Sequence, residues 1–237
     1  MRSVIDFHSH ILPGIDDGSA SIEESIALLK IEKQQGIDCV VATPHFYPLH
    51  DTPERFLRRR ARAEKMLRER IGGNSDLPEI KIGAEVYYFN GISDSDVISE
   101  LTIDGKRCIL IEMPAPPWGE SVYRELEALY VRRGILPIVA HIDRYISRFR
   151  TFGIPRRLSE LPVLVQANAE FFLNRSTAST AIRMLKHDGI HLLGSDCHDL
   201  KTRKPNLGDA LGRIRERLGE DVLERINEYE HDVLADS

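Results

Sequence analysis

The stretch SIEESIALLKIEKQQGIDCVVAT, residues 21–43, joins a helical pattern to a strand pattern and decides how the chain folds. Ser21 is a predicted helix cap because Glu24 follows three residues later, as in a capping box. The run Asp38–Thr43 at the end of the stretch is short, apolar and rich in β-branched residues, which predicts a buried strand. A similar run, Ser3–Phe7, precedes the helix, so the amino-terminal part of the chain predicts a β-α-β unit.

The same alternation of strand and helix patterns continues through the chain. The further predicted strands are Ile80–Glu85, Cys108–Ile111, Leu136–Ala140, Val163–Gln166 and His191–Gly194. Among the helices between them, one is predicted to begin at Ser176 and to close on Gly189. Strands that alternate with helices form a parallel sheet with right-handed crossovers. The near-equal units favour an α/β barrel of the (β/α)7 kind, with an open doubly wound sheet as the alternative. No linker-like stretch interrupts them, so we expect one domain over residues 1–237.

The composition is that of a globular protein with room for one substantial core. Of the 237 residues, 42% are hydrophobic and 29% are charged. The formal net charge of −5 does not favour nucleic acid or an anionic membrane as the main partner. Asp6 and His8 interrupt the first apolar run before it reaches signal-peptide length, and no window resembles a membrane span. Three widely spaced cysteines form no CxxC pair, so we expect a cytoplasmic chain with reduced thiols.

Histidines and acidic residues gather at the carboxyl ends of the predicted strands. They are His8, His10, Asp16, Asp17, His45, Glu85, Glu112, His141, Asp196 and His198. The carboxyl ends of parallel strands form the ligand-binding face in barrels and in open sheets alike. Imidazoles and carboxylates are ligands of Zn, Mn and Fe, and this set is too large for one tetrahedral ion. The sequence therefore predicts two or three metal ions.

One histidine at a strand end is more often a polar loop residue than a metal ligand. The prediction of a metal centre depends instead on the recurrence of such residues at six of the seven predicted strand ends. The remaining histidines, His50, His187, His191 and His231, fall elsewhere in the pattern. For these we expect surface or helix-capping roles.

Five motifs resemble those of the polymerase and histidinol phosphatase (PHP) superfamily. They are DFHSHILPGIDDGS, VATPHF, GAEVYYF, AHIDRY and SDCHDLKTRKPNLGDAL. More narrowly, they are similar to the manganese-dependent protein-tyrosine phosphatases of bacterial capsule and exopolysaccharide operons. The resemblance runs from Asp6 to Leu211 and implies the PHP fold, a distorted TIM-like (β/α)7 barrel with a trinuclear metal centre.

The resemblance also implies a set of ligands, residue by residue. The first group is His8, His10, Asp196 and Glu85; the second is Glu85, Glu112 and His141; the third is His45, His198 and Asp17. Glu85 would bridge the first two metals, and Asp16 stays open as the alternative to Asp17. Manganese is the metal that the family implies, and iron or zinc is compatible with the same ligands.

Two arginines match the phosphate pocket of the family, namely Arg144 and Arg203. A planar guanidinium suits a phosphate dianion, with a surface ion pair as the alternative role. The implied reaction is hydrolysis of phosphotyrosine in proteins, in which the metals activate water and the arginines neutralise phosphoryl oxygens. The implied partner is the tail of a membrane-associated bacterial tyrosine kinase that regulates capsule or exopolysaccharide synthesis. The segment Gln166–Phe172 departs from the family pattern, which leaves Asn168 open as a site residue.

Three other functions stay open. Cys197 and Arg203 have the C-x5-R spacing of thiol-based tyrosine phosphatases, although Asp196 and Asp199 beside them would repel both a thiolate and a phosphate. A PHP-type phosphatase of small molecules, such as histidinol phosphate, would keep the metals and the arginines. A binding protein with a structural metal centre would hold the metals without activity.

A strongly basic helix is predicted to start with Thr52 before Pro53, its first helical position, and to stop at Gly72–Gly73. It carries eight Lys or Arg and three Glu. Its apolar residues Phe56, Ala63, Met66 and Leu67 are expected to face inward and its basic residues to face solvent. The alternative is that the basic face docks the acidic surface of a partner or the inner leaflet of a membrane.

Overall fold

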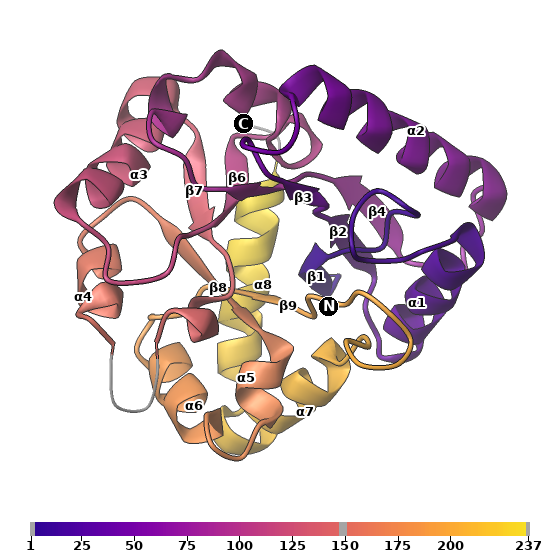
Figure 1. Ribbon diagram of the computed structural model, residues 1–237. Coiled ribbons are helices and arrows are strands. Elements are labelled where there is room, and N and C mark those ends of the chain that lie inside the picture. The colour runs from indigo at the N-terminus through magenta and orange to yellow at the C-terminus, as the bar shows by residue number, and fades with distance from the viewer. Residues whose placement is uncertain (1–2, 147–150, 236–237) are drawn as a thin grey trace.

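A curled parallel sheet forms the centre of the computed structural model, which describes residues 3–146 and 151–235 (Figure 1). The strands are β1 (Ile5–Ser9), β2 (Cys39–Ala42), β3 (His45–Phe46), β4 (Glu79–Ile82), β5 (Glu85–Tyr87), β6 (Cys108–Glu112), β7 (Leu136–Val139), β8 (Leu164–Asn168) and β9 (Leu192–Gly194). Only two residues separate β2 from β3, and β4 from β5. Within the described residues these strands therefore occupy the seven positions that the sequence predicts.

Neighbouring strands pair in parallel and follow the order of the chain. One ladder is β1-β2-β4, and the other is β3-β5-β6-β7-β8-β9. The first strand, β1, meets the segment that follows the last strand, β9, because the amide of Asp196 donates to the carbonyl of His8 over 2.8 Å. The amide of His10 likewise donates to the carbonyl of Cys197 over 2.9 Å, and an isolated parallel bridge joins Ser9 to Cys197. The sheet thus curls into a distorted barrel, as predicted, and the open sheet is excluded.

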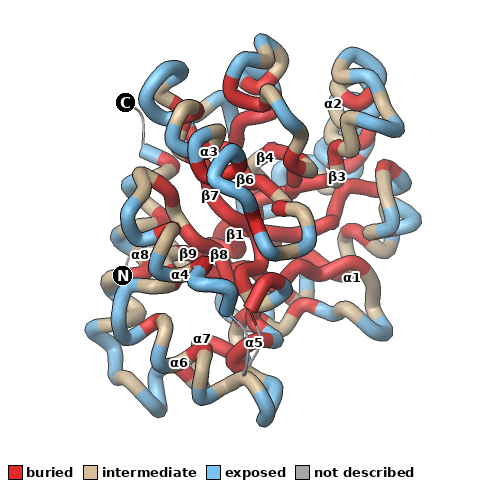
Figure 2. Tube along the Cα trace, turned by 60° about the vertical axis from the view of Figure 1, so that its left-hand side comes forward, coloured by how far each residue is buried: buried red, intermediate tan, exposed pale blue. Residues whose placement is uncertain are grey.

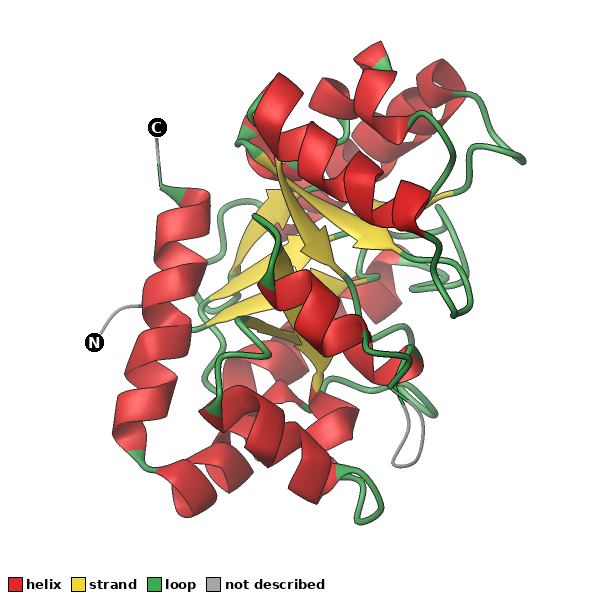
Figure 3. Ribbon diagram, turned by 90° about the vertical axis from the view of Figure 1, so that its left-hand side faces the viewer, coloured by secondary structure: helices red, strands yellow, loops and turns green. Residues whose placement is uncertain are grey.

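Helices surround this sheet. They are α1 (Ile22–Gln34), α2 (Pro53–Ile71), α3 (Glu120–Arg133), α4 (Ile154–Ser159), α5 (Ala169–Leu173), α6 (Ala178–Lys186), α7 (Leu207–Leu218) and α8 (Glu220–Leu234). The predicted caps are present: the Ser21 hydroxyl accepts from the amide of Glu24, and the Thr52 hydroxyl from the amide of Arg55. Figure 3 shows α8 standing beside the sheet at the edge of the molecule.

Two features of the helices differ from the prediction. α6 begins at Ala178 rather than at Ser176, because Asn174 Oδ1 accepts from both the amide and the hydroxyl of Ser176 and holds it in a turn. The helix ends at Lys186, and Asp188, rather than Gly189, adopts the left-handed conformation (φ +54°). The short helices α4 and α5 were not predicted.

The inward face of α2 is narrower than predicted. Phe56, Ala63 and Leu67 are buried, but Met66 is 39% exposed. Met66 precedes Leu67 by one residue and so lies about 100° around the helix from it, since a turn holds about 3.6 residues. The prediction that Met66 faces inward is therefore wrong.

The amino ends of the strands are closed by apolar side chains. An inner cluster of buried residues comprises Ile5, Phe7, Cys39, Val41, Ile103, Cys108, Leu110, Ile138, Ala140, Leu192 and Leu234. Leu234 belongs to α8, which therefore seals this end of the barrel. A larger cluster fills the space between the strands and the helices, and Figure 2 shows the buried residues concentrated along the strands. Polar side chains are left to gather at the opposite, carboxyl ends.

Candidate metal centre

A β-bulge in β1 aims the first histidines at the mouth of the barrel. The segment Asp6–Ser9 of β1 opposes the shorter segment Val40–Ala42 of β2, so β1 holds one extra residue. Such a residue re-aims the side chains next to it. As a result both Phe7 and His8 are directed inward: Phe7 joins the inner cluster, and His8 reaches the carboxylate of Glu85.

Four donor atoms converge at the centre of the mouth. The Nε2 atoms of His8 and His10 lie 3.1 Å apart, and they lie 3.2 and 3.3 Å from Glu85 Oε2. Asp196 Oδ1 lies 3.5 and 3.4 Å from the same two nitrogens. Four ligands in tetrahedral positions about 2.1 Å from an ion are about 3.4 Å from one another. The spacing of His8, His10 and Glu85 therefore fits one ion, and Asp196 lies beside both histidines.

Glu85 extends the cluster to its other side. Glu85 Oε1 lies 2.6 Å from His141 Nε2, which lies 3.8 Å from Glu112 Oε1. His45 Nδ1 lies 3.0 Å from Glu85 Oε2 and 3.9 Å from Glu112 Oε2. The structure thus brings Glu85, Glu112 and His141 together and adds His45 to them. Because its two oxygens face different donors, Glu85 is suited to bridge two ions.

The adjacent aspartates after β1 have different environments. Asp17 Oδ1 lies 3.5 Å from His45 Nε2 and 3.5 Å from His198 Nε2. Asp16 Oδ2 instead accepts from His10 Nδ1 over 2.9 Å and from the amide of His45 over 2.9 Å. An imidazole that donates from Nδ1 presents its Nε2 lone pair to a metal. The geometry favours Asp17 as a donor of the third group and Asp16 as the residue that orients His10.

The loop that carries these aspartates depends on Gly18. A Cβ atom at this position would lie 2.3 Å from the carbonyl oxygen of His10, so no larger residue fits without moving the backbone. The amide of Gly18 also donates to Asp16 Oδ1 over 2.9 Å. The loop is therefore packed directly against a histidine of the cluster.

Several buried atoms of the cluster have no hydrogen-bond partner among the described residues. They are His45 Nδ1, Glu112 Oε2, Asp196 Oδ1 and His198 Nε2. Buried polar atoms nearly always have a partner, because leaving one unpaired costs about 1–3 kcal/mol. Unpaired nitrogen and oxygen atoms that face one another are the donors expected around a cation, so these residues fit a metal centre.

Burial makes the charges of the cluster depend strongly on one another. Burial opposes the ionisation of Glu85 and Asp196, yet the neighbouring histidines hold the pKa of both carboxyls well below its usual range. Hydrogen bonds to carboxylates outweigh burial and raise the pKa of His10 well above its usual value. Burial lowers the pKa of His198 to about 4. The carboxylates are thus in their ligand form at neutral pH, and a cation would have to displace a proton from His10.

The two predicted phosphate-binding arginines meet at one carboxylate. Arg144 Nη2 lies 2.7 Å from Asp196 Oδ2, and Arg203 Nη2 lies 2.8 Å from the same oxygen. Asn168 Nδ2 donates to this oxygen over 2.8 Å. Both guanidinium groups are partly exposed, so they border the mouth while contacting a residue of the cluster. An anion at the mouth could meet both arginines at once.

Two residues of the cluster have strained backbones. His141 has φ +31° and Asp196 has φ +53°, in the left-handed region that non-glycine residues avoid. Such residues cost about 1–3 kcal/mol each and are retained mainly at functional sites. The strain supports a functional rather than a structural role for this end of the barrel.

Gln166 and Asp6 position the cluster and were missed in the sequence. Gln166 Oε1 accepts from the amide of His141 over 2.6 Å and lies 3.3 Å from His8 Nδ1. Asp6 Oδ1 accepts from the amides of His8 and Ser195, and Oδ2 accepts from the Ser195 hydroxyl. Asp6 thereby ties β1 to the segment that follows β9. A charged or amide side chain inside a buried strand was the available signal for both.

Cys197 is buried and unsuited to nucleophilic chemistry. All three cysteines are buried, and none of them forms a disulfide bond. Burial, together with the nearby Glu32 and Asp6, raises the pKa of the Cys197 thiol well above its usual value. A catalytic thiolate requires the opposite shift and an accessible sulfur. The structure therefore excludes the thiol-based alternative.

A cavity of about 470 Å³ adjoins the third donor group. It is lined by Asp17 and His45 and, from α2, by Arg55 and Arg59. Tyr47 also lines the cavity, and its ring stacks on that of His45, with centroids 4.9 Å apart. The volume is within the range of small-ligand pockets, about 300–1,000 Å³.

Known proteins match this chain over almost its whole length. The family model for capsular polysaccharide synthesis, CpsB/CapC, matches residues 4–233. The tyrosine-protein phosphatase CpsB of Streptococcus pneumoniae is 31% identical over 228 residues, 91% of this chain and 91% of that protein. The tyrosine-protein phosphatase YwqE of Bacillus subtilis is 25% identical over 228 residues, which are 92% of this chain and 87% of that protein.

Solved structures show the same fold. A structure from work on YwqE of Bacillus subtilis and CpsB of Streptococcus pneumoniae, described as unique metal-dependent tyrosine phosphatases, superposes with a TM-score of 0.85 at 22% identity. It covers 99% of this chain and 96% of that one. The phosphotriesterase homology protein of Escherichia coli has a TM-score of 0.55 at 11% identity and covers 97% of both chains. By its sequence, this chain belongs to the CpsB/CapC family of capsular polysaccharide synthesis proteins.

Proposed function

We propose that this chain is a metal-dependent protein-tyrosine phosphatase formed by one PHP-type domain over residues 1–237. The observation that carries the proposal is the convergence of Arg144 and Arg203 on a cluster of metal-type donors at the mouth of a barrel. Relatives that match over most of their length bear the name tyrosine-protein phosphatase. The alternative, a PHP-type phosphatase of small molecules, would use the same residues and is distinguished by its substrate.

The proposed centre holds two or three divalent ions. Manganese is the proposed metal, and iron or zinc is compatible with the same ligands. The proposed ligands are His8, His10, Asp17, His45, Glu85, Glu112, His141, Asp196 and His198. When bound, the ions supply Lewis-acid chemistry, which activates water at neutral pH and neutralises charge on the phosphoryl group. The chain contributes the pre-oriented donors, of which His10 is held by Asp16 and His8 faces Gln166.

Arg144 and Arg203 are the proposed catalytic and phosphate-binding residues. In the structure their guanidinium groups share Asp196 Oδ2, and an arriving phosphate offers three further acceptor oxygens to the same donors. Two planar forks would fix its orientation and neutralise charge that develops on the equatorial oxygens. A tyrosine leaving group has a parent pKa of about 10, so it needs less protonation than an alkoxide.

The proposed substrate is phosphotyrosine in the tail of a membrane-associated bacterial tyrosine kinase that regulates capsule or exopolysaccharide synthesis. The proposed location of the reaction is the cytoplasm. No helix within residues 3–146 and 151–235 has the length and apolar character needed to cross a membrane.

Activity on a phosphotyrosine peptide after chelation tests the proposal. We expect chelation to abolish turnover, and separate additions of Mn, Fe and Zn to restore it to different extents. His8→Ala should stay inactive after each addition, whereas Cys197→Ser should retain activity. Arg144→Ala should lower kcat/KM by about 100-fold or more, as expected for lost charge stabilisation. Turnover that survives chelation, or a higher kcat/KM for histidinol phosphate than for the peptide, would contradict the proposal.

A further inference from the structure

We propose that exposed arginines of α2 bind acidic residues that flank the phosphotyrosine in the substrate. The inference rests on the proposed function and adds a preference for the surrounding peptide. The arginines, here called the α2 stripe, are Arg55, Arg58 and Arg62. They are exposed, and α2 runs along the upper right edge of the molecule in Figure 1.

The α2 stripe begins at the cavity beside the metal centre. Arg55 lines that cavity together with Asp17 and His45, which belong to the third donor group. Its side chain is 68% exposed, and its Nε atom lies 3.6 Å from Asp51. A peptide whose phosphotyrosine occupies the mouth can therefore leave it past Arg55.

Other basic residues of α2 have structural partners. Arg59 donates to the carbonyl of Ile15 over 2.6 Å and pairs with Asp51. Arg60 donates to backbone carbonyls of Gly83 and Glu100 over 2.9 Å each. These arginines join α2 to neighbouring segments, so their guanidinium groups already have partners within the protein.

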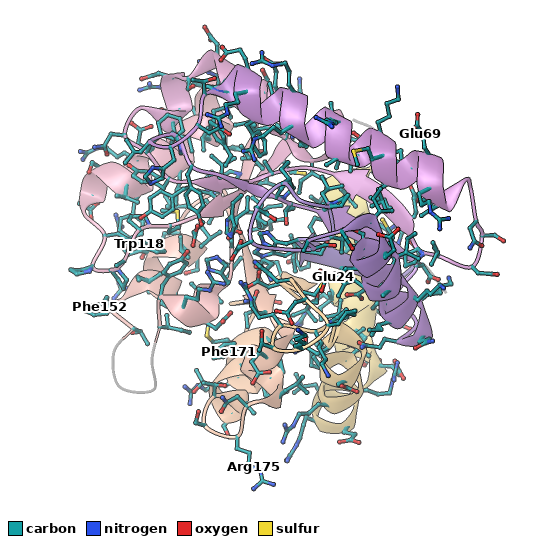
Figure 4. All side chains as sticks on the ribbon, turned by 45° about the vertical axis from the view of Figure 1, so that its right-hand side comes forward. Glu24, Glu69, Trp118, Phe152, Phe171 and Arg175 are labelled. Atoms are coloured by element: carbon teal, nitrogen blue, oxygen red, sulfur yellow. The ribbon has the colours of Figure 1, made fainter. Side chains whose placement is uncertain are left out.

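Arg58 and Arg62 have no such partners. Neither makes a hydrogen bond or an ion pair with any residue in the described ranges 3–146 and 151–235. Residues spaced by three and four along a helix share one face, which places Arg55, Arg58 and Arg62 in one row. Figure 4 shows side chains that project outward from this helix, with Glu69 near its far end.

The charge of α2 contrasts with that of the chain. The helix Pro53–Ile71 carries eight basic and three acidic residues, whereas the whole chain has a formal net charge of −5. A local excess of positive charge attracts anionic groups and raises their rate of encounter. Because the stripe leads out of the cavity, the anionic group that fits it best is part of the same molecule that enters the mouth.

The length of the α2 stripe sets the number of peptide residues that it can contact. Arg55 and Arg62 are seven residues apart, which is about 10 Å along a helix. An extended peptide covers this distance in about three residues. We therefore place the preferred Asp or Glu in a window of about three residues beside the phosphotyrosine.

The test compares peptides of one sequence with and without acidic residues in this window, on either side of the phosphotyrosine. For the double variant Arg58→Glu/Arg62→Glu we expect kcat/KM on an acidic peptide to fall by about 10-fold or more, through KM. Turnover of the neutral peptide and of p-nitrophenyl phosphate should change less than twofold. Arg124→Glu, an exposed arginine on α3, is the matched control and should change none of them. The preference of the wild type should weaken as salt rises from about 0.05 to 0.5 M.

Several results would overturn the inference. One is equal turnover of acidic and neutral peptides by the wild type, and another is a uniform loss on all substrates in the double variant. A third is that the double variant keeps the peptide selectivity of the wild type but no longer binds the anionic phospholipid vesicles that the wild type binds. This result would assign the stripe to a membrane. If the metal-loaded wild type hydrolysed no aryl phosphate, the proposed function would fail. Binding of peptides with non-hydrolysable phosphonomethylphenylalanine, acidic against neutral, would then decide the inference by itself.

Discussion

The two adjacent aspartates after β1, Asp16 and Asp17, have different contacts in the candidate metal centre. Asp16 uses both carboxylate oxygens within the protein, on His10, the amide of His45 and the amide of Gly18. The hydrogen bond from His10 outweighs burial and lowers the pKa of Asp16 to about 2. Asp17 is 65% exposed and keeps an oxygen 3.5 Å from His45 and from His198.

We predict different losses for Asp16→Ala and Asp17→Ala. Asp17→Ala removes a proposed donor, so the protein should bind one metal ion fewer. Asp16→Ala removes the group that orients His10, so the number of ions should be retained while the affinity falls by about 10–100-fold. Elemental analysis gives the number of ions and competition with a chelator gives the affinity. If Asp16→Ala lost an ion and Asp17→Ala did not, the assignment would be reversed.

The residues at the centre were only partly predictable from the sequence. Histidines and carboxylates at strand ends can be recognised, because the position of a strand end follows from its apolar pattern. The roles of Gln166 and Asp6 depend on contacts across the sheet, with His141 and Ser195. No local pattern encodes such contacts. The extra residue in β1 that aims His8 inward is likewise visible only in the pairing with β2.

At the scale of elements, helix ends with a side-chain cap were predicted well. The Ser21 and Thr52 caps act within three residues of the chain, so the sequence contains the whole interaction. The start of α6 was predicted wrongly because Asn174 competes for Ser176. α5 was not predicted either, because its five residues, Ala169–Leu173, are too few to show a helical period.

We predict that removing the cap of α2 weakens the folded state modestly. Thr52 accepts from the amide of Arg55 over 3.3 Å, so Thr52→Ala should lower the free energy of unfolding by about 1 kcal/mol. Thr52→Ser keeps the hydroxyl and should lose much less. Urea unfolding followed by circular dichroism measures both variants. Equal losses in Ala and Ser variants would show that the Thr52 methyl group, rather than the cap, is responsible.

At the scale of the whole molecule, the barrel is closed by apolar residues at one end and carries the candidate metal centre at the other. α8 closes the amino ends of the strands, where Asn227 donates to the carbonyl of Ser3 over 2.8 Å and Leu234 joins the inner cluster. The metal-type residues lie at the carboxyl ends. The apolar alternation of the chain predicts this division, because parallel strands place all their carboxyl ends together.

Glu230 on α8 is the exception within the closed end, and it links stability to pH. Burial raises the pKa of its carboxyl well above the usual range, and the nearby Asp6 adds to the effect. The folded protein therefore keeps a proton on Glu230 at pH values where the unfolded chain, with a pKa of about 4.3, has lost it. Between the two pKa values the free energy of unfolding falls by about 1.4 kcal/mol per pH unit as pH rises.

We therefore predict that Glu230→Gln is more stable than the wild type at pH 8 and that this advantage shrinks as pH falls toward 4. Glutamine has no proton to lose, so the variant lacks the contribution that weakens the wild type as pH rises. Urea unfolding of metal-free protein at several pH values measures the difference without a contribution from metal binding. Glu224→Gln, at an exposed position of the same helix, is the control and should show little pH-dependent difference. A stability difference for Glu230→Gln that stayed constant from pH 4 to 8 would mean that packing, rather than ionisation, governs this position.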